Sequence, residues 1–192
     1  SVGCDAVTID GFECAGHPGE DDIPSLVLLP QAAEALDIPV VGCGGFSDAK
    51  SLVAALALGA EGIAMGTRFM ATKESLIHQN VKDKMTESDE RSTNLMFRTM
   101  HNTARVFKNT ISDQVVEIES TGTATFEDVK DLVAGQRGRG VFEVGDLEAG
   151  IWSAGISVAR VKDVPTCEEL VSRMVSDAEA IMDGRLKEIR AS

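Results

Sequence analysis

Short apolar runs alternate with amphipathic stretches over residues 4–70 and predict alternating strands and helices. Val and Ile recur in the apolar runs, as they do in strands that are buried on both faces of a parallel sheet. The predicted strands are 4–9, 39–43 and 62–65, and the predicted helices are 23–36 and 49–58. Short connections join these elements in the order β–α–β–α–β, which is typical of an α/β fold with parallel strands.

The residue pattern also predicts the faces and ends of the two helices. In the first helix, which contains Pro30, one face carries the apolar residues Leu26, Leu29, Ala33 and Leu36. These four side chains have helical spacing and are expected to pack on the sheet. In the second helix, Ser47 is the expected N-cap, Asp48 adds negative charge to the first turn, and Gly59 ends the helix.

Glycine turns follow two consecutive predicted strands. Gly44-Gly45 follows the strand at 39–43, and Gly66-Thr67 follows the strand at 62–65. Parallel α/β proteins bind ligands at the carboxyl ends of their strands. Backbone N–H groups in such turns, together with a helix N-terminus and the Thr67 hydroxyl, suit a phosphate group. Each turn alone could be an ordinary glycine turn, but the pair at equivalent strand ends favours a phosphate held between them.

Beyond Met70 the βα alternation stops, and the pattern predicts an appended, mainly helical segment. Helices are expected over residues 74–85 and 111–119, and another begins at Thr125, whereas residues 93–98 fit either a strand or a helical turn. The sequence GQRGRG at residues 135–140 is expected to be a flexible basic loop. A final helix capped by Thr166 directs five apolar residues toward the core, namely Leu170, Met174, Ala178, Ile181 and Met182.

The charge balance excludes several classes of partner. The chain has 31 acidic and 18 basic residues and a net charge of −13. Nucleic acids and anionic membrane surfaces require basic faces, so neither is an expected partner. No apolar run approaches the roughly 20 residues of a membrane span. The 4 cysteines show no CxxC spacing, so we expect no zinc or other metal site, and reduced thiols favour a cytoplasmic protein.

His17 is the strongest candidate for a catalytic residue. It lies in a glycine-rich loop, residues 11–20, after a predicted strand. An imidazole titrates near neutral pH and can accept a proton there, although loop histidines are often simply exposed. Glu13 could orient His17 or be solvated, and Cys14 could be a nucleophile, although no local motif supports that role. The remaining candidates, His78, His101 and Cys43, are interpreted as surface or packing residues.

The stretch GCGGFSDAKSLVAALALGAEGIAMGTRF resembles the last two barrel strands of FMN-dependent (β/α)8 enzymes. Together with GFECAGHPGE upstream, it resembles the nitronate monooxygenase family, formerly called 2-nitropropane dioxygenases. Inosine-monophosphate dehydrogenases and other phosphate-binding barrels share the GG…GTRF pattern, and the AGH turn narrows the resemblance to the first family. That family often has glycine where this chain has Ala15.

The resemblance implies the C-terminal part of a TIM barrel, with about three parallel strands and a small helical lid. A complete barrel needs about 250 residues, and this chain has 192. The resemblance therefore implies that the N-terminal half of the barrel comes from elsewhere, such as a second chain, and it leaves a homodimer open. The implied division is 1–73 for barrel strands and the phosphate site, 74–150 for the lid, and 151–192 for the segment and helix that return to the barrel.

The resemblance also implies FMN as the cofactor and a role for each motif residue. FMN would be bound by Ala15, Gly16, Gly44, Gly45, Gly66 and Thr67. His17 would be the base that removes the α-proton of a nitroalkane, and Ser153 would lie near the flavin or substrate. In this family alkyl nitronates and nitroalkanes are oxidised with O2 to carbonyl compounds and nitrite.

Three alternatives stay open. An NAD(P)H-dependent flavin reductase, of the enoyl or quinone type, would share the phosphate turns on the same barrel. A flavin-free barrel such as a nucleotide dehydrogenase would bind a phosphorylated metabolite there instead. A non-catalytic fragment would act only as a structural partner of other segments.

Overall fold

A computed structural model of the chain describes residues 3–190, with the backbone alone at residue 190. Residues 1–2 and 191–192, the outer ends of the expected segments 1–73 and 151–192, lie outside the described residues. The first part holds a sheet of three strands in the order β1-β2-β3, and their parallel pairing confirms the predicted parallel strands. Its elements are β1 (Val7–Asp10), α1 (Ser25–Ala35), β2 (Val40–Cys43), α2 (Ala49–Ala57) and β3 (Gly62–Ala64).

Helix α1 packs on the sheet through a narrower stripe than the sequence predicts. Leu29 is fully buried, and it lies so close to β2 that a Cβ at Gly42 would come within 3.1 Å of its Cδ2 atom. Leu26 is 67% exposed and Leu36 is 39% exposed, so the expected four-residue face was wrong at both ends. The buried part of this face is centred on Leu29, which packs in one cluster with Val40 and Phe46.

Helix α2 (Ala49–Ala57) begins at Ala49 as predicted, but its N-cap differs from the expected one. Asp48, not Ser47, is its N-cap, because the Asp48 carboxylate accepts a hydrogen bond from the Ser51 N–H group while the Ser51 hydroxyl accepts one from the Asp48 N–H group. This reciprocal capping box satisfies two donors of the first turn. The other end is as predicted, because Gly59 follows the helix with φ +94°, a conformation that glycine adopts without strain.

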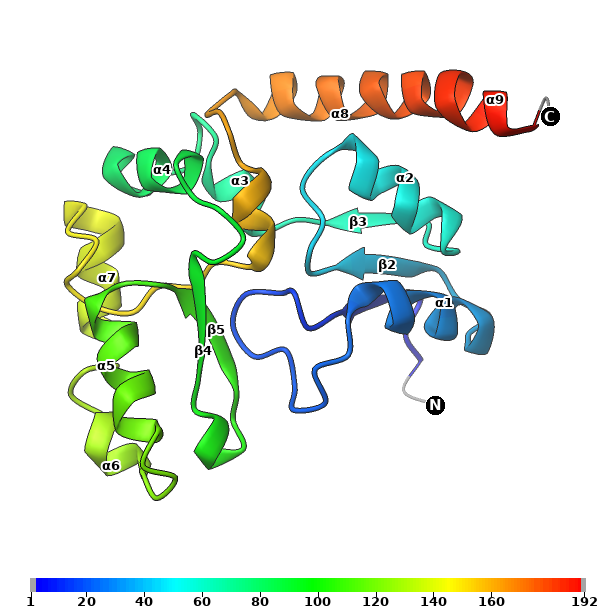
Figure 1. Ribbon diagram of the computed structural model, residues 1–192. Coiled ribbons are helices and arrows are strands. Elements are labelled where there is room, and N and C mark those ends of the chain that lie inside the picture. Colours follow the sequence, from blue (N-terminus) through cyan, green and yellow to red (C-terminus); the bar gives the residue numbers. More distant parts are fainter. Residues whose placement is uncertain (1–2, 191–192) are drawn as a thin grey trace.

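The long helix α8 (Cys167–Ile181) packs along α2 (Figure 1). The predicted Thr166 cap is confirmed, since its hydroxyl accepts a hydrogen bond from the Glu169 N–H group. Leu170, Met174 and Ala178 are buried as predicted. Met182 was predicted to face the core but is 43% exposed, because it lies in the wider turn that carries the helical rod past the end of α2 (Figure 1).

The appended segment contains an antiparallel hairpin that the sequence predicted only in part. Residues 93–98, which fitted two structures, contain strand β4 (Thr93–Met96), and its partner β5 (Ala104–Phe107) was not predicted. Helix α5 (Thr110–Glu119) agrees with the predicted helix at 111–119. Helix α6 (Phe126–Val129) begins after the expected Thr125 cap. A buried cluster that includes Met96, Val115 and Val129 joins these elements.

The sequence GQRGRG is not a flexible loop, because it forms the first part of helix α7 (Gly135–Val144). Close packing explains the middle glycine of this sequence, since a Cβ at Gly138 would lie 2.6 Å from the carbonyl oxygen of Ile151. The remaining elements are α3 (Thr67–Met70), α4 (Gln79–Thr86), η1 (Arg98–Met100), η2 (Ile156–Arg160), η3 (Met182–Leu186) and α9 (Lys187–Arg190). No helix among residues 3–190 combines the length and the apolar character needed to cross a bilayer.

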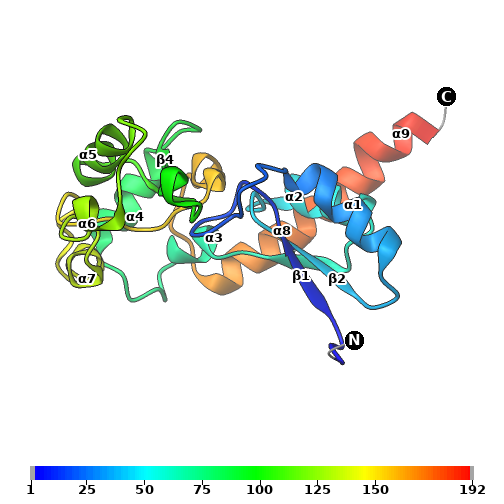
Figure 2. The same ribbon diagram turned by 90° about the horizontal axis from the view of Figure 1, so that it is seen from below.

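The sheet with α1, α2 and α8 forms one side of the molecule, and the hairpin with α5, α6 and α7 forms the other (Figures 1 and 2). The loop between β1 and α1 reaches from the sheet to the hairpin (Figure 1). Trp152 is 2% exposed and stacks on Phe107, with 4.1 Å between ring centroids. The division at residues 73 and 150 stays a prediction.

Candidate functional site

A hollow of about 170 Å³ lies at the carboxyl ends of the three parallel strands. Among the residues that line it are Asp10, Glu13, Cys14, Ala15, Cys43, Gly44, Gly45, Phe46, Gly66, Thr67, Gly155 and Ser157. The hollow thus brings together five predicted cofactor residues, namely Ala15, Gly44, Gly45, Gly66 and Thr67. Gly16, His17 and Ser153 are not part of its lining.

The conformation of the turn Gly44-Gly45 is constrained by the residues that pack against it. Both residues have positive φ angles, +76° and +87°. A Cβ at Gly44 would lie 2.9 Å from the Cβ of Cys14, and a Cβ at Gly45 would lie 3.2 Å from the Cβ of Glu13. The loop after β1 therefore packs directly on this turn, and glycine is required there even without a phosphate.

Several backbone donors of the hollow are free to bind an anion. The N–H groups of Gly45, Phe46 and Gly66 donate no hydrogen bond to any of residues 3–190. Free N–H groups at glycine positions form the kind of concave site that phosphates occupy, so the residues present fit the phosphate of FMN. The N-terminus of α2 contributes less than expected, because the Asp48 carboxylate already caps it. Of the free donors, Gly45 and Phe46 lie in the turn before α2, and Gly66 lies in the turn after β3.

The neighbouring residues Thr67 and Arg68 have different partners. Thr67 is buried, and its Oγ1 atom accepts a 2.9 Å hydrogen bond from the Gly155 N–H group, which leaves the hydroxyl hydrogen free to donate. Arg68 is also buried, but its guanidinium donates to the carbonyl oxygens of Ala71 and Asp163 and to the Asp163 carboxylate. In the GTRF motif the threonine therefore belongs to the hollow, and the arginine anchors the chain before α8.

Both cysteines of the hollow are held as neutral thiols. Burial raises the pKa of the Cys43 thiol to about 12, and its hydrogen bond to Asp10 acts in the same direction. Burial also raises the pKa of Cys14, with the Asp10 charge as the next cause. A nucleophilic cysteine requires a thiolate, so this environment argues against the nucleophile role considered for Cys14.

Glu13 neither orients His17 nor faces solvent freely, so both interpretations from the sequence were wrong. Its carboxylate accepts hydrogen bonds from the Ser25 N–H group, at 2.9 and 3.2 Å, and from the Ser25 hydroxyl at 3.2 Å. Ser25 is the first residue of α1, and a carboxylate is stabilised at a helix N-terminus. Glu13 therefore fixes the loop after β1 to α1.

His17 is exposed, and its side chain makes no hydrogen bond with any described residue. The residue before it, Gly16, has a φ angle of +77° and forms a β-bridge with Arg105 of β5. Ser153 is also exposed, between the buried residues Trp152 and Ala154. The imidazole is thus available to a ligand, and its loop is fixed by the hairpin.

The other two histidines have structural positions. The Nδ1 atom of His78 accepts a hydrogen bond from the Asn80 N–H group and caps α4. His101 is exposed at the turn of the hairpin. The sequence analysis missed Arg105 in β5 and Thr103 directly before it, which hold the loop of His17. A four-residue strand with one arginine gives too short a pattern to recognise.

Solved structures of known proteins share this fold. FabK from Thermotoga maritima is 28% identical with a TM-score of 0.87, over 98% of this chain and 58% of that chain. A nitroalkane oxidase from Streptomyces ansochromogenes is 30% identical with a TM-score of 0.73, over 93% of this chain and 52% of that chain. These similarities confirm the predicted α/β fold, with about three parallel strands of a barrel.

A curated relative from Rhodococcus jostii is named (3aS,4S,5R,7aS)-5-hydroxy-7a-methyl-1-oxo-octahydro-1H-indene-4-carboxyl-CoA dehydrogenase. It is 30% identical, and the match covers 93% of this chain and 60% of the relative. The chain therefore spans little more than half the length of the proteins it matches. The family model described as nitronate monooxygenase matches residues 1–177, so this chain belongs to the nitronate monooxygenase family, as the AGH and GTRF motifs predicted.

Proposed function

We propose that this chain supplies the FMN phosphate site and the catalytic base of a nitronate monooxygenase. Its substrates would be alkyl nitronates and nitroalkanes, which O2 converts to carbonyl compounds and nitrite. The observation that carries the proposal is the hollow between Gly44-Gly45 and Gly66-Thr67, together with the exposed His17 a few residues beyond Ala15 of its lining. Family membership supports the same chemistry.

The backbone would hold the phosphate, because none of the described residues that line the hollow has a basic side chain. The free N–H groups of Gly45, Phe46 and Gly66 and the free hydroxyl hydrogen of Thr67 are suitable donors. When bound, FMN would supply the electron acceptor, which no side chain can provide. The protein's own contribution would be to orient the cofactor and substrate and to move a proton.

His17 would accept the α-proton of a neutral nitroalkane. Its imidazole is exposed and has no hydrogen-bond partner among the described residues, so it is free to contact a substrate. A positioned base accelerates such a step by roughly 10²–10⁴-fold. A nitronate has already lost this proton, so its oxidation should depend far less on His17.

The decisive experiment compares these two substrates in the FMN-loaded protein. Replacing His17→Asn should lower kcat/KM for a neutral nitroalkane by roughly 10²-fold or more and largely spare the matching nitronate. His101→Asn is a matched control, because His101 is also exposed but lies at the turn of the hairpin. Equal losses on both substrates would assign His17 to structure or flavin positioning, and no loss would leave it an ordinary loop histidine.

The second candidate is an NAD(P)H-dependent flavin reductase on the same scaffold. This candidate is supported by the similarity of the chain to a relative that is named as a dehydrogenase of a carboxyl-CoA compound. Anaerobic reduction of bound FMN distinguishes the two, because a monooxygenase of this class is reduced by the nitronate and a reductase by NADPH. Absence of a flavin spectrum from the purified protein would instead favour a flavin-free phosphate-binding barrel or a non-catalytic fragment.

A further inference from the structure

Arg105 is a buried cation without an ion pair. It is 3% exposed and has no carboxylate within 4.0 Å among the described residues. Its guanidinium donates from Nε and Nη2 to the carbonyl oxygen of Phe12, at 3.3 and 2.9 Å, and from Nη1 to Thr93 Oγ1 at 3.1 Å. Burying an unpaired charge is unfavourable, so this position needs an explanation beyond packing.

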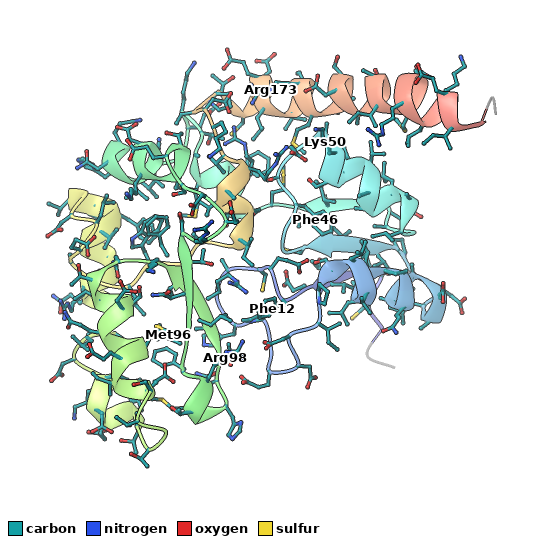
Figure 3. The ribbon with its side chains drawn as sticks, viewed as in Figure 1. Phe12, Phe46, Lys50, Met96, Arg98 and Arg173 are labelled. Atoms are coloured by element: carbon teal, nitrogen blue, oxygen red, sulfur yellow. The ribbon has the colours of Figure 1, made fainter. Side chains whose placement is uncertain are left out.

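The backbone of Arg105 holds the same loop at a second point. Arg105 and Gly16 exchange two backbone hydrogen bonds, with N···O distances of 2.6 and 3.0 Å. The guanidinium carbon lies 4.5 Å from the centroid of the Phe12 ring. Phe12 belongs to the loop that connects β1 to α1, and this loop lies beside the hairpin (Figure 3). One residue of β5 therefore fixes the loop at Phe12 and at Gly16, directly before His17.

On the C-terminal side of His17, the loop is held by Thr103, the residue directly before β5. Thr103 is buried and donates to the Glu20 carboxylate from its N–H group at 2.7 Å and from its hydroxyl at 2.6 Å. His17 thus lies between two attachment points, Gly16 and Glu20. Its own side chain stays free, so the position of the imidazole depends on these attachments.

We propose that Arg105 is the positioning residue for His17. It anchors the loop of residues 11–20 to the hairpin and so holds the imidazole at the carboxyl edge of the sheet. The inference rests on the proposed role of His17 as the base. Because Arg105 acts through His17 and lies outside the lining of the hollow, it should affect proton transfer more strongly than FMN binding.

The kinetic test uses Arg105→Met in the FMN-loaded protein. A misplacement of about 1 Å costs roughly 10²-fold in rate, so we expect about that loss for the neutral nitroalkane, little loss for the nitronate, and a much smaller change in the FMN dissociation constant. The double variant with His17→Asn should lose no more than His17→Asn alone. Arg105→Lys, which retains a donor for the Phe12 carbonyl, should recover most of the activity. Equal losses on both substrates, or additive losses in the double variant, would overturn the proposal.

Amide hydrogen exchange tests the anchor without any turnover. In Arg105→Met, peptides covering residues 11–20 should exchange at least tenfold faster, and peptides from α2 and α8 should be unchanged. Arg91→Met is the matched control, because Arg91 is exposed and its guanidinium makes only a 3.9 Å contact, from Nε to the Glu90 carboxylate, with the described residues. Unchanged exchange in the loop would refute the inference even if His17 is the base. Faster exchange in a protein that oxidises no nitro compound would support the anchor and reject the proposed function.

Discussion

The N–H group of Gly155 donates a 2.9 Å hydrogen bond to the Oγ1 atom of Thr67, and both residues are buried. Gly155 also lies against the loop after β1, where its Cβ would come within 2.9 Å of the Glu13 carbonyl oxygen. The same carbonyl accepts a hydrogen bond from the Ile156 N–H group. The hollow is therefore assembled from four distant stretches of chain, which contain residues 10–15, 43–46, 64–67 and 155–157, and the Thr67 hydroxyl joins the last two of them.

Removing the Thr67 hydroxyl should destabilise the fold. Thr67→Val keeps the shape of the side chain but leaves the buried Gly155 N–H group without an acceptor, which costs about 1–3 kcal/mol. Thr67→Ser retains the hydroxyl and is the matched control. Urea unfolding measures the difference, and equal free energies of unfolding for the two variants would contradict this role.

Gly45→Val should abolish FMN binding. Gly45 has a φ angle of +87°, and a Cβ there would lie 3.2 Å from the Cβ of Glu13, so a branched side chain would distort the turn that presents the free N–H groups. Gly122→Val is the matched control, because Gly122 also has a positive φ, +75°, but has no atom within 4 Å of its Cβ position. Equilibrium dialysis with FMN is the measurement. An unchanged affinity in Gly45→Val would place the phosphate elsewhere.

The sequence was sufficient to predict the parts of the site that depend on local pattern. The glycine turns at 44–45 and 66–67 follow apolar strands directly, so their position at one sheet edge follows from strand order alone. The partners of Glu13 and Gly16 could not be predicted, because Ser25 and Arg105 reach them only through tertiary packing. Helix α7 was missed for a related reason, since packing of Gly138 against Ile151 outweighs the low helix propensity of glycine.

Cys43 should resist alkylation at neutral pH. With a pKa raised to about 12 by burial and by the hydrogen bond to Asp10, roughly one Cys43 side chain in ten thousand is a thiolate at pH 8. Cys4 is exposed and should react with iodoacetamide much earlier. Asp10→Asn removes a negative charge that raises this pKa, so Cys43 should react faster in that variant. Mass spectrometry of labelled peptides gives both rates, and similar labelling of Cys4 and Cys43 at pH 8 would contradict the prediction.

The attachment of the His17 loop at Glu20 should weaken in acid. Hydrogen bonds from the Thr103 hydroxyl and N–H group lower the pKa of Glu20 below its usual 4.5. A carboxyl whose pKa is lower in the folded state stabilises the fold above its unfolded pKa, and this contribution disappears as the pH falls through the folded pKa. Wild type and Glu20→Gln should therefore differ in Tm at pH 6 and converge below about pH 4.5.

The convergence of the two Tm values at low pH distinguishes the hydrogen bonds between Glu20 and Thr103 from a general effect of surface charge. Asp21→Asn is the matched control, because Asp21 is an exposed neighbouring carboxylate that makes no hydrogen bond with the described residues. Its Tm should follow the wild type across the whole pH range. Thr103→Val removes the hydroxyl donor from the other side and should flatten the pH dependence in the same way as Glu20→Gln. If Glu20→Gln differs from the wild type equally at pH 6 and pH 3, the ionised form of Glu20 does not hold this loop.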